Sequence, residues 1–300
     1  MMRTGFAPMN TEPQWENRDT LVKYLANQLF DGKLCLVLGA GISMPFGLPS
    51  WKDLIAAMCS ASSCPYSPDK LEDNAEFIKT TVYASDADGF IKLVHDSLYA
   101  DFTLDLANLF QSETLKGIGA LVMASSRGSI SSIVNFNFDN LLEKYLEYHG
   151  FVAQSEGHEV FWNTNADVKV YHPHGFIPYE GDAKGEIVFD RQSFLDRIRQ
   201  PSHPWNQMLS TLFRTHTCLY VGLSGDDDAL FSLLQAVNDC HPASEEDTLY
   251  NGVLLSVGTD PQMRNKWRTR RVFAHDIRDY ESDLPKFLFE ICQGAARLRS

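Results

Sequence analysis

The sequence has no paired cysteines of the kind that chelate zinc, no long apolar run and no excess of positive charge. Its six cysteines are scattered and none forms a C-x-x-C pair, so we interpret them as reduced packing thiols. The longest apolar run, residues 34–42, is shorter than the roughly 20 residues of a membrane span. The N-terminal residues also lack the apolar core of a signal peptide. We therefore expect a soluble cytoplasmic protein without a membrane partner.

The charge balance is acidic, with 26 basic against 39 acidic side chains and a formal net charge of -13. Such a surface repels a phosphate backbone, so direct nucleic-acid binding is not expected. The chain has 300 residues, of which 44% are hydrophobic and 22% charged, as in an ordinary globular protein. Because no repeat or flexible linker is visible, we expect a single domain over residues 1–300.

Short apolar runs recur along the chain at intervals typical of an α/β protein. The run Leu34–Leu38 ends at a glycine, as expected for a strand that is buried on both faces of a parallel sheet. Four similar runs cover residues 132–136, 168–171, 218–221 and 253–257. Residues at about 52–125 have mostly helical periodicity. The pattern predicts a Rossmann-like, doubly wound, mostly parallel sheet with an inserted helical module.

The residues that follow each run are the first candidates for a site, because ligands of open parallel sheets bind at the carboxyl ends of the strands. Residues 39–43 read Gly-Ala-Gly-Ile-Ser, a turn that lets backbone N–H groups approach a pyrophosphate closely. The dehydrogenase fingerprint requires a small residue at position 44, where this chain has Met44. The next residue, Pro45, opposes an immediate helix. An ordinary Rossmann hydride-transfer enzyme is therefore disfavoured.

Polar side chains follow the later runs as well. Asn137 and Asp139 come after the second run, His174 after the third, and a Gly-Leu-Ser-Gly segment with Asp227 after the fourth. Since these strand ends meet at one edge of a parallel sheet, we expect the polar groups to converge there.

Some of these residues have a structural interpretation of equal weight. Asn137, Asp139 or Asn140 would each suit the cap of the helix that follows them. Asp227 is a candidate cap for the next helix, and a glycine-rich strand end can be a plain tight turn. The individual residues leave both interpretations open.

Two further features carry less weight. His172 and His174 would face the same side of a strand, which permits a two-histidine metal site, but no third ligand is evident. We therefore expect no metal. The basic side chains between residues 264 and 271 suit an anion site or an acidic partner, although a solvated surface is the simpler interpretation.

Together, the motifs resemble the sirtuin superfamily over about residues 34–227. They are Gly39-Ala40-Gly41-Ile42-Ser43, Gly47-Leu48-Pro49-Ser50-Trp51, Asn137-Phe138-Asp139, His174-Gly175 and Gly222-Leu223-Ser224. The Gly-Leu-Pro-Ser-Trp and Asn-Phe-Asp variants are similar to the bacterial sirtuin-like branch used in anti-phage defence.

The resemblance implies a Rossmann-like domain that binds NAD as a substrate. It implies catalytic roles for Asn137, Asp139 and His174, with Asn137 and Asp139 facing the nicotinamide ribose. The implied cofactor-binding residues are Gly39, Ala40, Gly41, Ser43, Pro49, Trp51, Gly222, Ser224 and Asp227.

The resemblance also separates two activities. Deacylating sirtuins carry a four-cysteine zinc module, and this sequence offers no such ligand set. The defence branch instead hydrolyses NAD to ADP-ribose and nicotinamide, often depleting the cell. The resemblance thus implies an NAD+ glycohydrolase effector, switched on by an infection signal or a partner protein and working as a homo-oligomer or with that partner. The alternatives are a non-catalytic subunit that binds NAD or ADP-ribose, and an NAD-dependent deacylase.

Overall fold

The computed structural model describes residues 12–123, 130, 132–156, 165–181, 187–189, 202–225, 228–239 and 250–298. Within these residues, seven strands form one parallel sheet in the order β3-β4-β2-β1-β5-β6-β7. The strands are β1 (Leu34–Leu38), β2 (Ser132–Asn135), β3 (Ala153–Glu156), β4 (Val168–Tyr171), β5 (Thr217–Val221), β6 (Gly252–Val257) and β7 (Val272–Ile277). The predicted Rossmann-like α/β class is confirmed.

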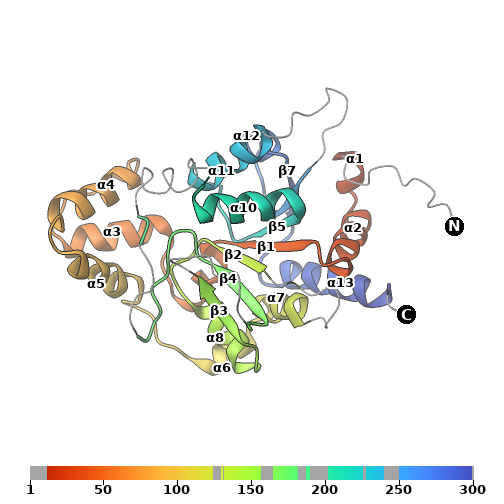
Figure 1. The fold of residues 1–300 in the computed structure, drawn as a ribbon, viewed down its shortest axis with the longest axis horizontal. Coiled ribbons are helices and arrows are strands. Elements are labelled where there is room, and N and C mark those ends of the chain that lie inside the picture. Colours follow the sequence, from red (N-terminus) through yellow and green to blue (C-terminus); the bar gives the residue numbers. More distant parts are fainter. Residues whose placement is uncertain are drawn as a thin grey trace.

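Helices flank this sheet on both faces (Figure 1). Up to β2 they are α1 (Glu12–Trp15), α2 (Arg18–Phe30), α3 (Trp51–Ala61), α4 (Leu71–Phe77), the π-helical turn η3 (Ile78–Val82), α5 (Ala87–Leu98), α6 (Leu106–Gln111) and α7 (Glu113–Met123). After β2 they are α8 (Leu141–Tyr148), α10 (Pro204–Thr215), α11 (Asp228–Asp239), α12 (Pro261–Arg268) and α13 (Asp283–Arg297). In the described part of the chain, none of them combines the length and apolar character that a membrane span requires.

The central strand β1 fixes where a ligand site is expected. All five of its residues are buried, and it pairs in parallel with β2 on one side and β5 on the other. The chain completes β2, β3 and β4 on one side before it returns to β5 on the other. Ligands of open α/β sheets bind at the carboxyl ends of the strands where the strand order reverses in this way. The turns after β1 and β5 occupy this position.

The two faces of the sheet belong to separate hydrophobic cores. Along β1, Cys35 and Val37 point into a core that also contains Trp205 of α10 and Trp267 of α12. Leu34, Leu36 and Leu38 point into the other core, which is shared with α2, α7, α8 and α13. This alternation follows from the two-residue period of a strand, and it explains why the whole run is apolar.

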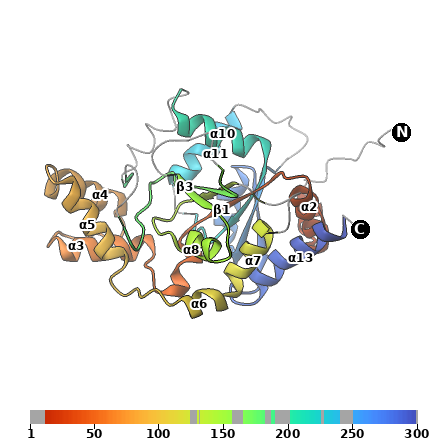
Figure 2. The same cartoon turned by 60° about the horizontal axis from the view of Figure 1, so that its bottom comes forward.

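The helices between β1 and β2 divide into two groups. α3, α4 and α5 lie together at one end of the molecule, opposite α2 and α13 (Figures 1 and 2). α7 packs against α8 and α13 instead, and thus belongs to the layer that covers the sheet. The region expected as one helical module is helical, but only its first half stands apart from the sheet.

Two strands were missed in the sequence. β7 reads Val-Phe-Ala-His-Asp-Ile, and the polar His275 and Asp276 interrupt its apolar run. β3 reads Ala-Gln-Ser-Glu and lies at the edge of the sheet, where a strand needs no apolar run. Both strands are recognised by their pairing with β6 and β4 rather than by their composition.

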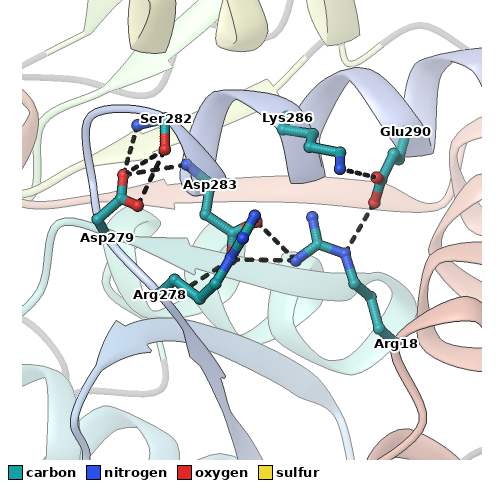
Figure 3. A network of polar contacts seen from close by, with 7 residues as sticks. All are labelled: Arg18, Arg278, Asp279, Ser282, Asp283, Lys286 and Glu290. Atoms are coloured by element: carbon teal, nitrogen blue, oxygen red, sulfur yellow. Dashed lines mark hydrogen bonds and ion pairs between the residues drawn. The ribbon is translucent and has the colours of Figure 1, made fainter.

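α2 and α13 lie side by side and are joined by charged side chains, which we call the terminal clamp (Figure 3). Arg18, the first residue of α2, donates to Asp283 at 3.0 Å and to Glu290 at 2.9 Å, both on α13. Arg278 donates to the same Asp283 carboxylate through its backbone N–H at 2.9 Å and its guanidinium at 3.1 Å. Asp283 is only 2% exposed, so the clamp encloses a buried charge that is paired from two sides.

Candidate active site

The turn after β1 is built by close contact with the turn after β5. Gly39 donates its N–H to the carbonyl of Val221 at 3.0 Å, and Gly41 donates to the carbonyl of Gly222 at 2.9 Å. A Cβ atom at Gly41 would lie 2.8 Å from the Cα atom of Gly222, and one at Gly39 would lie 2.7 Å from the Gly222 carbonyl oxygen. Glycine is therefore required because two backbones meet here.

The same contact explains Gly222. Its φ of +74° lies in the left-handed region that favours glycine, and a Cβ there would lie 2.9 Å from the backbone nitrogen of Ile42. Of the other implied residues on this loop, Ser224 is exposed, whereas Asp227 lies outside the described residues.

The N–H groups of the β1 turn point into the protein. Besides those of Gly39 and Gly41, the N–H of Ile42 donates to Gly39 at 3.2 Å and that of Ser43 donates to Ala40 at 2.9 Å. The turn therefore offers a ligand close approach to a surface of small residues, with these four donors already used. Ala40 is half-buried, and Gly41 is exposed.

No α-helix follows the turn directly, as Pro45 predicts. Two short 3₁₀ turns (Ala40–Ile42 and Met44–Phe46) lead to α3, which begins at Trp51 with Ser50 as its cap. Trp51 is half-buried against Phe189, with ring centroids 4.9 Å apart, and Pro49 is also half-buried. The Gly-Leu-Pro-Ser-Trp motif thus serves locally as the entry to α3.

Asn137 reaches from the end of β2 to the glycine turn. Its side-chain amide donates to the Gly39 carbonyl at 3.1 Å and to the Ser43 hydroxyl at 3.2 Å. The residue is 7% exposed. Since the amide nitrogen points toward β1, Asn137 does not cap the following helix. The cap position is Asn140, whose side chain makes no capping bond, and the Asp139 carboxylate one residue earlier accepts the N–H of Leu141 at 3.1 Å.

Asp139 is buried beside Asn137 and is joined to it through Ser43. The Ser43 hydroxyl accepts from Asn137 and donates to the Asp139 carboxylate. Burial raises the pKa of Asp139 to about 6, although the bonds from Leu141 and Ser43 lower it. Glu143 raises the pKa further, and His172 opposes this. The site therefore contains a carboxylate that changes charge just below neutral pH.

His174 lies on the loop after β4, against the aromatic residues on either side of Asn137. Its ring centroid is 5.4 Å from that of Phe136 and 6.2 Å from that of Phe138. Phe138 stacks on Phe189 at 5.1 Å. Since Trp51 also packs on Phe189, one aromatic cluster connects the start of α3 with His174.

Helix α5 supports the loop that carries His174. The Tyr99 hydroxyl donates to the carbonyl of Ile177 at 2.7 Å, and the Ile177 N–H donates to the carbonyl of Phe138 at 2.7 Å. The N–H of Tyr179 donates to the Asn140 side chain at 3.2 Å. α3 through Trp51 and the C-terminal end of α5 through Tyr99 thus contact residues around the candidate site.

His172 belongs to the site in a way that the sequence did not suggest. It is fully buried, and its ring nitrogens contact the backbone carbonyl of Asn137 at 2.9 Å and the Glu143 carboxylate at 2.6 Å. Burial lowers the pKa of His172, but Glu143, the Asn137 carbonyl and Asp139 outweigh that effect, and the net pKa is raised. His172 and His174 do not group with a third potential ligand within the described residues.

The structure therefore brings Gly39, Ser43, Asn137 and Asp139 into one hydrogen-bonded group, with His174 and Trp51 attached through aromatic contacts. Glu143 was missed because a glutamate in a helix is usually interpreted as a surface residue. Its only signal in the sequence is its place in the first turn of the helix that follows Asp139.

Residues 131–272 match the SIR2-like domain family. The matched segment contains Asn137, Asp139, His174, Gly222 and Ser224, whereas the glycine turn after β1 precedes it.

Solved structures of Sir2 homologues are similar to this chain. A Sir2 homologue in complex with NAD is 14% identical, with 94% of this chain and 95% of that chain covered and a TM-score of 0.49. A mutant Sir2 homologue with ADP-ribose is 13% identical over 92% of this chain and 97% of that chain, with a TM-score of 0.47. A comparison with curated protein sequences finds no match.

Proposed function

We propose that this SIR2-like protein hydrolyses NAD+ to ADP-ribose and nicotinamide. The observation that carries the proposal is the hydrogen-bonded group of Asn137, Ser43 and Asp139 on the glycine turn, with His174 packed against Phe136 and Phe138 on either side of Asn137. It lies at the carboxyl edge of the sheet, where the strand order reverses, inside a chain with a SIR2-like domain.

In the proposed complex the pyrophosphate lies over the glycine turn, close to Ala40 and Gly41. These residues contribute shape, because a ligand can approach the backbone without meeting bulky side chains. The nicotinamide ribose lies toward Asn137 and Asp139, and the adenosine lies toward Gly222 and Ser224. Trp51 and Pro49 close the side of the site formed by α3.

The reaction requires little covalent chemistry from the protein. The bond between ribose C1′ and the nicotinamide nitrogen breaks, and its electron pair neutralises the pyridinium, so the leaving group needs no proton. A water oxygen forms the new bond to C1′ and releases a proton, which the His174 imidazole is suited to accept. The Asp139 carboxylate stabilises the positive charge that grows on the ribose. Asn137 orients the water or a ribose hydroxyl, since an amide donates and accepts.

The test is to incubate purified protein with NAD+ and measure nicotinamide release. We expect release without any acetylated peptide, and a fall of about 100-fold or more in Asn137→Ala and His174→Ala. Matched controls are Asn265→Ala, on the exposed side of α12, and His216→Ala, which precedes β5 at the opposite edge of the sheet. Both controls should keep the wild-type rate.

The other outcomes separate the alternatives. Binding of NAD without product, unchanged in Asn137→Ala, would identify a non-catalytic nucleotide-binding subunit. Release that depends on an acetylated peptide would identify a deacylase. Silence of the wild-type protein, both alone and with extract from phage-infected cells, would contradict NAD hydrolysis.

We also propose that the protein acts in anti-phage defence by depleting NAD. This part is supported by the Gly-Leu-Pro-Ser-Trp and Asn-Phe-Asp motifs, and it requires a partner or infection signal that keeps the enzyme silent beforehand. The NAD content of bacteria that express the protein should stay normal until phage infection and then fall. Cells that express His174→Ala should keep their NAD, and an equal loss in both would contradict the role of this site.

A further inference from the structure

The protonation of His172 follows from its two contacts. Its Nδ1 atom lies 2.9 Å from the carbonyl oxygen of Asn137, and a carbonyl only accepts, so Nδ1 must donate. Its Nε2 atom lies 2.6 Å from Oε1 of Glu143, which also accepts the Ser155 hydroxyl at 2.8 Å. The pKa of His172, which Glu143 and the Asn137 carbonyl raise, favours the arrangement in which Nε2 also donates, an imidazolium paired with the Glu143 carboxylate.

The peptide of Asn137 is held at both ends. The side-chain oxygen of Asn135 accepts its N–H at 3.1 Å, and His172 donates to its carbonyl. β2 and β4 pair with Val134 beside Tyr171, and one further step along this register places Asn135 beside His172. The Asn137 carboxamide, which contacts Gly39 and Ser43, thus extends from a backbone that two neighbouring side chains fix.

We propose that Glu143 and His172 form a positioning pair, which fixes the Asn137 peptide and thereby aims the Asn137 carboxamide at the reacting ribose. The inference rests on the NAD hydrolysis proposed above. His172 acts through Asn137, while Glu143 acts through His172 by keeping it charged and oriented. Neither residue touches the substrate.

Burying a charged pair at this position costs desolvation free energy, and the packing of the core does not require such a pair. His172 is 0% exposed and Glu143 2% exposed, and both lie in the apolar layer between the sheet and α8. A buried ion pair is often replaceable by apolar residues without loss of stability. A buried, oriented imidazole next to a site residue is instead typical of a group that orients its neighbour.

The pair also carries charge into the site. The charged groups that face His172 are Glu143 from α8 and Asp139 from the loop before it. The positive charge of His172 lowers the pKa of Asp139, and Glu143 raises it. Removal of the imidazolium, with Glu143 kept, should therefore raise the pKa of Asp139 and move the acid limb of the pH–rate profile upward.

Three substitutions of His172 separate its contacts. His172→Asn places an amide N–H near the Nδ1 position and keeps the contact with Asn137. His172→Gln reaches toward Glu143 but loses the contact with Asn137, and His172→Phe loses both. We expect kcat of His172→Asn to stay near that of the wild type, whereas the other two lose about 100-fold, as for a misplaced catalytic group. KM should change little, and the acid limb should shift upward in all three.

The matched control is His275→Asn, a buried histidine on β7 away from the site. It should leave kcat and the pH profile unchanged. Wild-type kcat and pH profile in His172→Phe, or equal losses in His172→Asn and His172→Phe, would overturn the inference. A wild-type protein that does not hydrolyse NAD would instead contradict the proposed function.

A second measurement tests the pair without any turnover. NMR spectra of protein labelled with 15N-histidine, assigned with His172→Asn, should show that His172 keeps protons on both ring nitrogens to a higher pH than an ordinary histidine does. Substitution Glu143→Gln should lower the pH at which the ring loses its second proton. A wild-type ring that loses its second proton at the pH of an ordinary histidine, or below it, would contradict the pair.

Discussion

Asp139 and Asp283 are two aspartates that are buried to nearly the same extent, 3% and 2% exposed, and their environments are opposite in charge. At Asp283, burial raises the pKa, but Arg278 and Arg18 outweigh it and bring the pKa to about 2. At Asp139 burial raises the pKa to about 6, Glu143 adds repulsion, and the positive charge of His172 offsets these only in part. The terminal clamp thus encloses a satisfied charge, whereas the site encloses a destabilised one.

The difference separates a carboxylate that stabilises the fold from one that the fold holds at a cost. A lowered pKa in the folded state means stability that is present above the unfolded value and lost as the pH falls. A raised pKa means that stability is lost as the pH rises, because the folded state then prefers the protonated form. Strongly raised carboxylates in a cleft are candidates for chemistry, since nothing in the packing requires their charge.

The largest effect that we expect is on turnover in Asp139→Asn. The asparagine keeps the bonds to Leu141 and Ser43 but removes the negative charge that the proposed complex sets against the ribose, so NAD hydrolysis should fall by at least about 100-fold. In the wild type, the rate should rise with pH as Asp139 ionises near pH 6. A variant that retains more than a tenth of the wild-type rate would contradict an electrostatic role for Asp139.

The same substitution should stabilise the fold. The wild-type carboxyl prefers its proton when folded, so ionisation costs about 3 kcal/mol above pH 6, and Asp139→Asn avoids this cost. Denaturant unfolding should show the variant to be more stable at pH 8, with the difference closing as the pH falls from about 6 to about 4. A variant that is less stable than the wild type at pH 8 would show that Asp139 serves the fold.

Asp283→Asn should have the opposite effect on stability and destabilise the fold. The substitution removes the negative charge that pairs with two arginines. We therefore expect the free energy of unfolding to fall by about 2 kcal/mol at neutral pH. Because the folded pKa lies below the unfolded one, this difference should vanish as the pH falls from about 4 to about 2. NAD hydrolysis per folded molecule should stay unchanged, and a selective loss of turnover would link the clamp to the site.

The smallest effect is expected within the clamp itself. Arg18 is 28% exposed and contacts both Asp283 and Glu290, whereas the side chain of Arg278 is 74% exposed. Solvent screens the more exposed pair, so Arg278→Met should lower the melting temperature less than Arg18→Met does. Both should leave unchanged the pH dependence of stability between about pH 4 and about pH 6, since Asp139 causes it. The reverse ranking would mean that Asp283 depends mainly on Arg278.

Much of this arrangement could be predicted from the sequence, and the rest depends on tertiary contacts. The five central strands are visible because a strand that is buried on both faces is apolar throughout. Asn137, Asp139 and His174 follow such runs, so topology alone brings them to one edge. The edge strands β3 and β7 contain polar residues and are defined only by their partners.

The individual contacts of the site and of the terminal clamp could not be predicted, because they depend on distances between residues that a sequence pattern does not contain. The glycines at positions 39 and 41 fit the approach of a ligand, and the structure shows that they are also required by contact with Gly222. His172 was considered only as a metal ligand, because its partner Glu143 looks like a solvated helical residue in the sequence. Asp283 likewise resembles an ordinary acid in the first turn of a helix, and its two arginines come from distant or irregular segments.

The most direct test of the account is the time course of nicotinamide release from NAD+ by the wild-type protein beside Asn137→Ala, each assayed alone and with extract from phage-infected cells. The account predicts steady release by the wild type in at least one condition, without acetylated peptide, and about 100-fold slower release by the variant. Equal rates for the two proteins would show that the group on the glycine turn is not where NAD reacts.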